Sequence, residues 1–97
     1  MAAYHMRYDR EFMRQLEGLP GDIRSMARRQ VRDLADMPCP AQAKELEEHP
    51  GYYRLWLPRE YRLVWQVHED EQVVELMYVG LKHPDLYKRL GLGRVGI

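Results

Sequence analysis

The spacing of apolar residues changes along the chain, and each change predicts a different kind of element. Near the amino terminus, large apolar residues alternate with polar ones from Tyr4 to Tyr8, the period of a short half-buried strand. Asp9 is a favourable helix N-cap, and the apolar residues that follow it, as far as Leu19, have helical spacing. A second helical stripe begins after a Gly/Pro break, with Asp22 as its expected cap. Its apolar positions are Ile23, Met26, Ala27, Val31, Leu34 and Ala35. We expect two antiparallel helices.

The period becomes two at Tyr52, after a polar, acidic stretch at residues 41–50 whose one bulky apolar residue is Leu46. Residues 52–57 and 61–67 read as two strands joined by a tight connection at Pro58–Glu60. The residues expected to face the core are Tyr53, Leu55, Leu57, Tyr61, Leu63, Trp65 and Val67. Those expected to face away are Tyr52, Arg54, Trp56, Arg62, Val64 and Gln66. A charged turn, a third strand at residues 72–80 and a short helix at residues 84–91 complete the pattern.

These elements predict an α+β fold in which a helix hairpin packs on one face of a small, mostly antiparallel four-stranded sheet. The order is β-α-α-β-β-β-α, and residues 1–97 are expected to form a single domain. Because strand residues alternate between the two faces, Trp65 is expected to be buried and Arg62 to be exposed on the opposite face.

Composition limits the cellular locations and the kinds of binding site to be expected of the protein. The chain has no run of about 20 apolar residues such as a membrane span needs, and no apolar signal segment at its start. Its one cysteine, Cys39, lies between two prolines and reads as a loop thiol, in keeping with a cytoplasmic protein. The formal net charge is zero, so a nucleic-acid site has to be a local feature.

A local site of this kind follows from the strand alternation. Arg54, Trp56 and Arg62 share one face of the predicted sheet. The residues that arrive at the end of the third strand and are expected to close over the same face are Lys82, His83 and Tyr87. Cations bind phosphates and aromatic planes stack on bases, so the set suits single-stranded RNA. The alternative is that the arginines are merely solvated, Trp56 covers apolar surface and His83 is a loop residue.

Other polar residues carry weaker signals. The arginine row on the second helix, at Arg24, Arg28, Arg29 and Arg32, reads as a solvated face, with a contact to RNA or the ribosome as the alternative. His49 and His68 lack the spacing of zinc ligands, and no phosphate-binding loop or nucleophile elbow is present. We expect neither a metal nor a cofactor.

Three segments of the chain resemble the RelE/ParE superfamily of bacterial toxins. They are LPGDIR at Leu19–Arg24, GYYRLWLPREYRLVWQV at Gly51–Val67 and YVGLKHPDLYKR at Tyr78–Arg89. The similarity extends over residues 4–90 in the same order and spacing. Its most specific parts are the Tyr61–Arg62 pair and the glycine that is followed by a basic loop and then Tyr87.

The resemblance implies two helices on one face of a small sheet and a working face opposite. It also implies the toxin of a type II toxin–antitoxin pair, neutralised by a cognate antitoxin. Toxins of the RelE branch are metal-independent endoribonucleases (mRNA interferases) that enter the ribosomal A site and cut mRNA, which arrests translation. The ParE branch inhibits DNA gyrase.

By position, the resemblance implies catalytic roles for Arg54, Arg62, Lys82 and Tyr87. His83 joins this catalytic set as a candidate proton carrier, because histidine is the commonest general acid or base. Trp56, Tyr52 and Gln66, which strand alternation places on the same face, are expected to bind RNA. Trp56 departs from the family pattern, because RelE itself has a strand lysine there. Tyr87 is present and the ParE-type histidine–glycine–arginine pattern is absent, which favours RNA cleavage. A gyrase inhibitor and a catalytically degenerate family member remain as alternatives.

Overall fold

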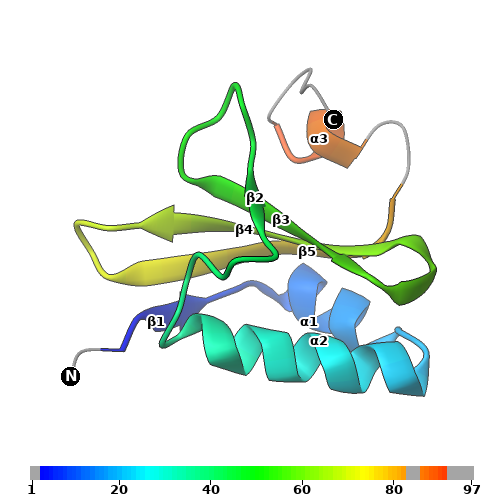
Figure 1. Ribbon diagram of the computed structural model, residues 1–97. Helices are drawn as coiled ribbons and strands as arrows, with labels where there is room; N and C mark the ends of the chain where they lie inside the picture. Colours follow the sequence, from blue (N-terminus) through cyan, green and yellow to red (C-terminus); the bar gives the residue numbers. More distant parts are fainter. Residues whose placement is uncertain (1–2, 83–85, 92–97) are drawn as a thin grey trace.

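The computed structural model describes residues 3–82 and 86–91. A sheet lies between two helices on one face and a short third helix on the other (Figure 1). The described elements, in chain order, are β1 (His5–Arg7), α1 (Arg10–Glu17), α2 (Gly21–Leu34), β2 (Lys44–Glu45), β3 (Tyr52–Leu57), the 3₁₀ helix η1 (Pro58–Glu60), β4 (Tyr61–His68), β5 (Val73–Leu81) and α3 (Leu86–Arg89). Among these residues, no helix is long and apolar enough to span a membrane.

The strands are ordered β1-β5-β4-β3-β2, and β1 runs parallel to β5 while the other neighbours are antiparallel. The predicted α+β class and the helix hairpin are confirmed. The predicted strand number was wrong, because the described part of the chain contributes a fifth strand, β2. This strand has two residues within the polar stretch, too few to produce a readable period.

The two long helices begin differently. Asp9 caps α1 as predicted, since its Oδ1 accepts a hydrogen bond of 2.9 Å from the Phe12 backbone N–H. The predicted cap of α2 was wrong: Pro20 is the N-cap residue, and it makes no side-chain hydrogen bond. Asp22 instead accepts from Arg59, with both carboxylate oxygens 2.9 Å from the same nitrogen. That bond lowers the pKa of Asp22 and ties α2 to the β3–β4 connection.

The main core lies between the helix pair and the sheet. Trp65 is fully buried there, as predicted, and its Nε1 donates to the Pro38 carbonyl at 2.9 Å. Tyr53 stacks on the Trp65 ring at 6.0 Å between centroids. Two apolar residues lie outside this core against expectation: Tyr8 follows the end of β1, and Met26 lies on the outer side of α2.

A bulge in β5 changes which of its residues face the helices. Val64 pairs with Tyr78 but Trp65 pairs with Leu76, so Met77 is an extra residue in β5. Val79 is thereby directed into the main core, and Gly80 lies opposite Arg62. A Cβ on Gly80 would come within 2.7 Å of the Tyr78 hydroxyl, so a larger residue here would have to displace the end of the Tyr78 side chain.

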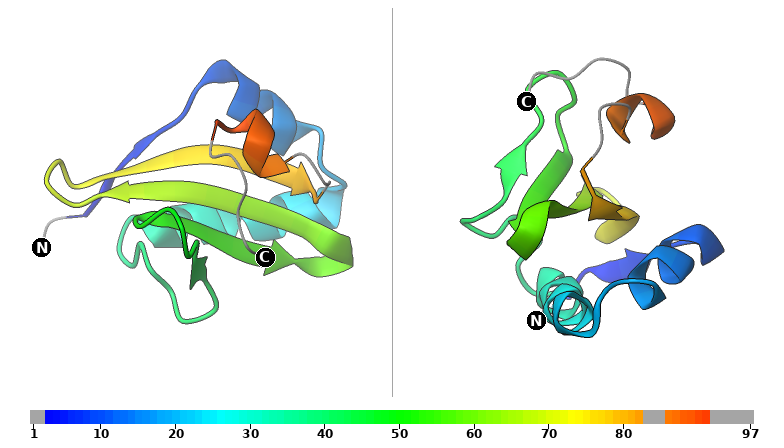
Figure 2. Two further views of the ribbon diagram at one scale, coloured as in Figure 1. Left: turned by 90° about the horizontal axis from the view of Figure 1, so that it is seen from above. Right: turned by 90° about the vertical axis from the view of Figure 1, so that its right-hand side faces the viewer.

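A second apolar cluster covers the other face of the sheet, beneath α3. Figure 2 (right) shows α3 and the α1–α2 pair on opposite sides of the strands. The buried members of this cluster are Leu46, Val64, Leu86 and Tyr87, with Tyr52, Met77, Tyr78 and Leu90 packed against them. The face expected to be free is therefore partly a core.

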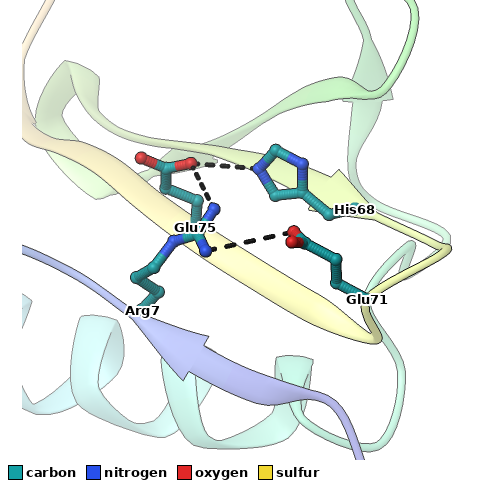
Figure 3. A network of polar contacts seen from close by, with 4 residues as sticks. All are labelled: Arg7, His68, Glu71 and Glu75. Carbon is teal, nitrogen blue, oxygen red and sulfur yellow. Dashed lines mark hydrogen bonds and ion pairs between the residues drawn. The ribbon is translucent and has the colours of Figure 1, made fainter.

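A polar network occupies the β1 side of the same sheet (Figure 3). Glu75 Oε1 lies 3.0 Å from His68 Nε2 and accepts from Arg7 at 3.2 Å. Glu71 lies 4.0 Å from the same arginine. The hydrogen bonds from His68 and then Arg7 lower the pKa of Glu75. The network joins β1, β4 and β5 through one carboxylate.

We expect Glu75→Gln to lower the free energy of unfolding at neutral pH by about 1 kcal/mol or less, since the group is partly exposed. A carboxylate whose pKa is lower in the folded state stabilises above its unfolded pKa, about 4.3, and that contribution is lost as the pH falls through the folded value. Urea unfolding of the variant and the native chain should therefore converge once the pH falls below the lowered pKa of Glu75. Glu47→Gln, at an exposed site, is the control. A difference that persists at low pH would refute this assignment.

Candidate active site

The β3–β4 hairpin fixes the central pair of the site. The η1 connection is tight, and Arg59 and Glu60 both adopt left-handed backbone angles with φ of 59° and 66°. This connection sets a register in which Trp56 lies directly opposite Arg62. Residues opposite each other in neighbouring strands share a face, so the indole and the guanidinium meet on the side away from α1 and α2.

Arg62 is wholly buried, with 0% of its surface exposed. Its Cζ lies 4.0 Å from the centroid of the Trp56 ring and 5.8 Å from that of Tyr87. One terminal nitrogen, Nη1, donates to the Tyr87 hydroxyl at 2.6 Å. The guanidinium is therefore held by two aromatic residues, one from β3 and one from α3.

Nε and Nη2 of Arg62 make no hydrogen bond within the described chain. Burial lowers the pKa of the Arg62 guanidinium, Tyr87 opposes that effect, and the nearby charge of Arg54 lowers the pKa further. An arginine remains charged at neutral pH. A buried charge with unmet donors is costly, and such an arrangement favours the binding of an anion.

Two further cations surround the same indole. Arg54, 8% exposed, has its Cζ 5.9 Å from the Trp56 centroid, and Lys82 has its Nζ 5.6 Å from it. The backbone N–H of Lys82 donates to the Glu60 carbonyl at 3.1 Å, which holds the end of β5 beside the hairpin. Trp56 itself is 46% exposed. Three positive charges thus converge on one aromatic ring at the edge of solvent.

The structure brings together most of the residues singled out from the sequence. Those that meet are Arg54, Trp56, Arg62, Lys82 and Tyr87. The expectation that Arg62 is exposed was wrong: it lies on the predicted face, but Trp56 and the α3 cluster cover it. His83 lies outside the described residues.

Tyr52 and Gln66 pair with each other across β3 and β4. They lie away from Arg62, because Gln66 follows it by four residues, roughly 13 Å along an extended strand. Gln66 is instead a diagonal neighbour of Arg54, which pairs with Val64. Tyr52 is half-buried in the second cluster.

Other residues considered from the sequence lie elsewhere. Arg28, Arg29 and Arg32 are exposed on α2, on the opposite side of the sheet, and Cys39 is an exposed free thiol. His49 makes an edge contact with Tyr52, and within the described ranges no three His, Cys, Asp or Glu side chains are grouped to hold a metal ion.

Two contributors to the site were not predicted from the sequence. Leu86 is buried and docks α3 on the sheet beside Tyr87. The apolar residues Leu86 and Leu90, four apart in the terminal helix, were the available signal. Lys44 was assigned to a polar stretch, yet it pairs in β2 with Arg54 and so belongs to the same face.

Neither a protein-family model nor a curated protein matches this chain in sequence. Solved structures do match. A double mutant of the E. coli toxin RelE in the free state is 23% identical, with a TM-score of 0.76 over 92% of this chain and 95% of that chain. The toxin–antitoxin complex RelBE from E. coli matches at 26% identity and TM-score 0.72, over 84% of this chain and 99% of that chain. An archaeal RelE–RelB complex from Pyrococcus horikoshii OT3 matches at 18% identity and TM-score 0.71, over 84% and 98%. The chain therefore has the RelE-like fold.

We expect Arg62→Met to leave the melting temperature unchanged or to raise it. An apolar side chain of similar length removes the desolvation cost of a charge with two unpaired donors, and such replacements are often neutral or stabilising by about 1–4 kcal/mol. The double variant Arg62→Met/Tyr87→Phe also removes the Tyr87 hydroxyl, which would otherwise lose its hydrogen bond from Arg62. Leu63→Ala, a fully buried neighbour in β4, should cost about 2–5 kcal/mol and calibrates the assay. A comparable loss in Arg62→Met would mean that the guanidinium is a structural element.

Proposed function

We propose that this chain is the toxin of a type II toxin–antitoxin pair and acts as an endoribonuclease on mRNA in the ribosomal A site. The observation that carries the proposal is the buried Arg62, with two unpaired donors beside the Tyr87 hydroxyl. The RelE-like fold supports it, because the solved structures with this fold include RelE toxins alone and in complex with RelB.

The proposed reaction is a transfer within the RNA backbone. The 2′-oxygen of one nucleotide attacks the adjacent phosphorus, and the bond from phosphorus to the 5′-oxygen of the next nucleotide breaks. The products are a 2′,3′-cyclic phosphate and a 5′-hydroxyl. One proton leaves the 2′-oxygen and another reaches the 5′-oxygen, so the reaction needs no oxidant and, in this proposal, no metal ion.

Arg62 and Arg54 are the proposed phosphate ligands. Negative charge accumulates on the phosphate oxygens in the transition state, and preorganised donors in a dry site stabilise that charge strongly. Nε and Nη2 of Arg62 form the edge of the guanidinium that can donate two parallel hydrogen bonds to one phosphate. The proton carriers are then sought among Lys82, Tyr87 and His83.

Trp56 is the proposed contact for a base next to the scissile phosphate. Its indole covers Arg62 at 4.0 Å, yet it is 46% exposed at the edge of the hairpin. A nucleotide that enters must shift this ring to reach the guanidinium, and the shifted ring offers a plane on which a base stacks. Tyr52 and Gln66 would bind a base farther along the strands.

A cognate antitoxin is the proposed protein partner. The E. coli and P. horikoshii neighbours are toxins captured with RelB, and this chain matches them over nearly their whole length. Antitoxin segments of this kind are short chains that fold on binding.

Inhibition of DNA gyrase is the second candidate function. The observation that favours it is Trp56, which occupies the position of a strand lysine in RelE and leaves the site with one cation fewer.

Arg62→Met should slow messenger cleavage by about 10²–10³-fold in kcat with a smaller change in KM, because its donors act mainly in the transition state. The measurement is cleavage of mRNA on programmed ribosomes, beside supercoiled plasmid incubated with gyrase and ATP. Arg28→Met, an exposed arginine of α2, is the matched control and should match the native rate.

Two outcomes would contradict the proposal. One is intact messenger at every ribosome concentration together with trapped gyrase cleavage, which would favour the second candidate. The other is equal cleavage by the native chain and Arg62→Met, which would remove Arg62 from the reaction.

A further inference from the structure

Strand β2 adds a cation to the site face. Lys44 pairs in register with Arg54 of β3, so the two side chains stand opposite each other on the same face of the sheet. Lys44 is exposed, whereas Arg54 is 8% exposed. Arg62 is the diagonal neighbour of Arg54, since Arg54 pairs with Val64. Such diagonal positions are about 7–8 Å apart.

These like charges repel one another. Two cations directly opposite in neighbouring strands destabilise a sheet, and the charge of Arg54 also lowers the pKa of Arg62. No ion pair within the described chain includes Lys44, Arg54, Arg62 or Lys82. An uncompensated row of this kind costs free energy in the free protein, and a bound polyanion would offset the cost.

Three arginines outside this face have carboxylate partners. Arg7 pairs with Glu75, Arg14 with Glu11, and Arg59 with Asp22. The chain has as many acidic as basic side chains, 15 of each, so carboxylates are not scarce. The exposed arginines of α2 also lack an ion pair within the described chain, but they are solvated, whereas Arg54 and Arg62 are buried. Four cations gathered on one face, two of them buried and none with a carboxylate partner among the described residues, point to a surface that receives its negative charge from a ligand.

The row is too long for one phosphate. Neighbouring strands lie about 4.8 Å apart and Arg62 is two residues along β4 from the position opposite Arg54, so the backbones of Lys44 and Arg62 are about 12 Å apart. Lys82 extends the row beyond Arg62 at the end of β5. A phosphate seated on Arg62 therefore leaves Lys44 for a neighbouring one.

We propose that Lys44 is an RNA-binding residue, which takes, together with Arg54, the phosphate of a nucleotide next to the one that is cleaved. The phosphate-binding surface then crosses four strands, with one cation from each of β2, β3 and β4 and a fourth just after β5. This inference rests on the proposed RNA substrate, and it makes Lys44 a binding residue that does not contact the reacting atoms.

The test is the salt dependence of binding to a short single-stranded RNA that carries 2′-deoxy sugars and so cannot be cut. Each phosphate contact on a single strand contributes about 0.7 to the slope of log K against log salt. Between about 50 and 200 mM salt, Lys44→Gln should lower the slope by about 0.7 and Lys44→Arg should restore it. Arg28→Gln, on the opposite side of the sheet, should keep the native slope. On ribosomes, Lys44→Gln should raise KM and leave kcat unchanged.

The outcomes separate this inference from the proposed function. A native slope in Lys44→Gln, or no salt-dependent binding by the native chain, would overturn the role of Lys44. A reduced slope in Lys44→Gln with no messenger cleavage by the native chain would support a nucleic-acid surface and refute the nuclease. A fall in kcat at unchanged KM would also contradict a role for Lys44 in binding alone.

Discussion

The burial of the Arg62 guanidinium is the constraint on which the other features of the site depend. A charge without exposed surface requires partners on several sides, and they come from distant parts of the chain: Trp56 from β3 and Tyr87 from α3. The tight η1 connection sets the register that brings the indole over the guanidinium. Leu86 docks α3 so that the Tyr87 hydroxyl is within hydrogen-bonding distance. Displacing η1, β3 or α3 would expose the Arg62 guanidinium to solvent and separate the residues of the site.

The two faces of the sheet therefore have different roles: one provides stability, and the other carries the candidate binding site. The helix-facing side carries an apolar core around Trp65, which holds most of the buried apolar residues. The opposite side carries a small cluster under α3, a row of cations without ion-pair partners among the described residues, and the Glu75 network near β1. The bulge in β5 directs Val79 into the core on the helix-facing side. On the other side, the missing side chain of Gly80 leaves room for the end of the Tyr78 side chain. The stability that the core provides offsets the free-energy cost of gathering cations on the face where a ligand would bind.

The fold class and the strand residues of the candidate site were predictable because both depend on residue periodicity, whereas Lys82 and Tyr87 were predicted from their position after the third strand and from the family resemblance. Alternation in residues 52–67 assigned Arg54, Trp56 and Arg62 to one face, and the structure agrees. Alternation says nothing about what covers a face, so the burial of Arg62 by Trp56 and α3 was missed. The two-residue strand at Lys44–Glu45 has no period to read, and its pairing with β3 appears only in three dimensions. Asp22 was predicted to be a helix cap because it follows a Gly/Pro break. Its actual partner, Arg59, is 37 residues away in sequence, and no local pattern indicates such a bond.

The proposed mechanism depends most on the unpaired edge of Arg62, which would receive the scissile phosphate. The most direct measurement is a crystal structure of the protein with an uncleavable 2′-deoxy RNA spanning the cleavage point. We expect the Trp56 ring to move off Arg62 and one phosphate to accept hydrogen bonds from both Nε and Nη2. The distances from each nitrogen to oxygen should be about 2.7–2.9 Å, as in charge-assisted pairs. A bound RNA whose phosphates all lie away from Arg62, with the indole still covering the guanidinium, would contradict this mechanism.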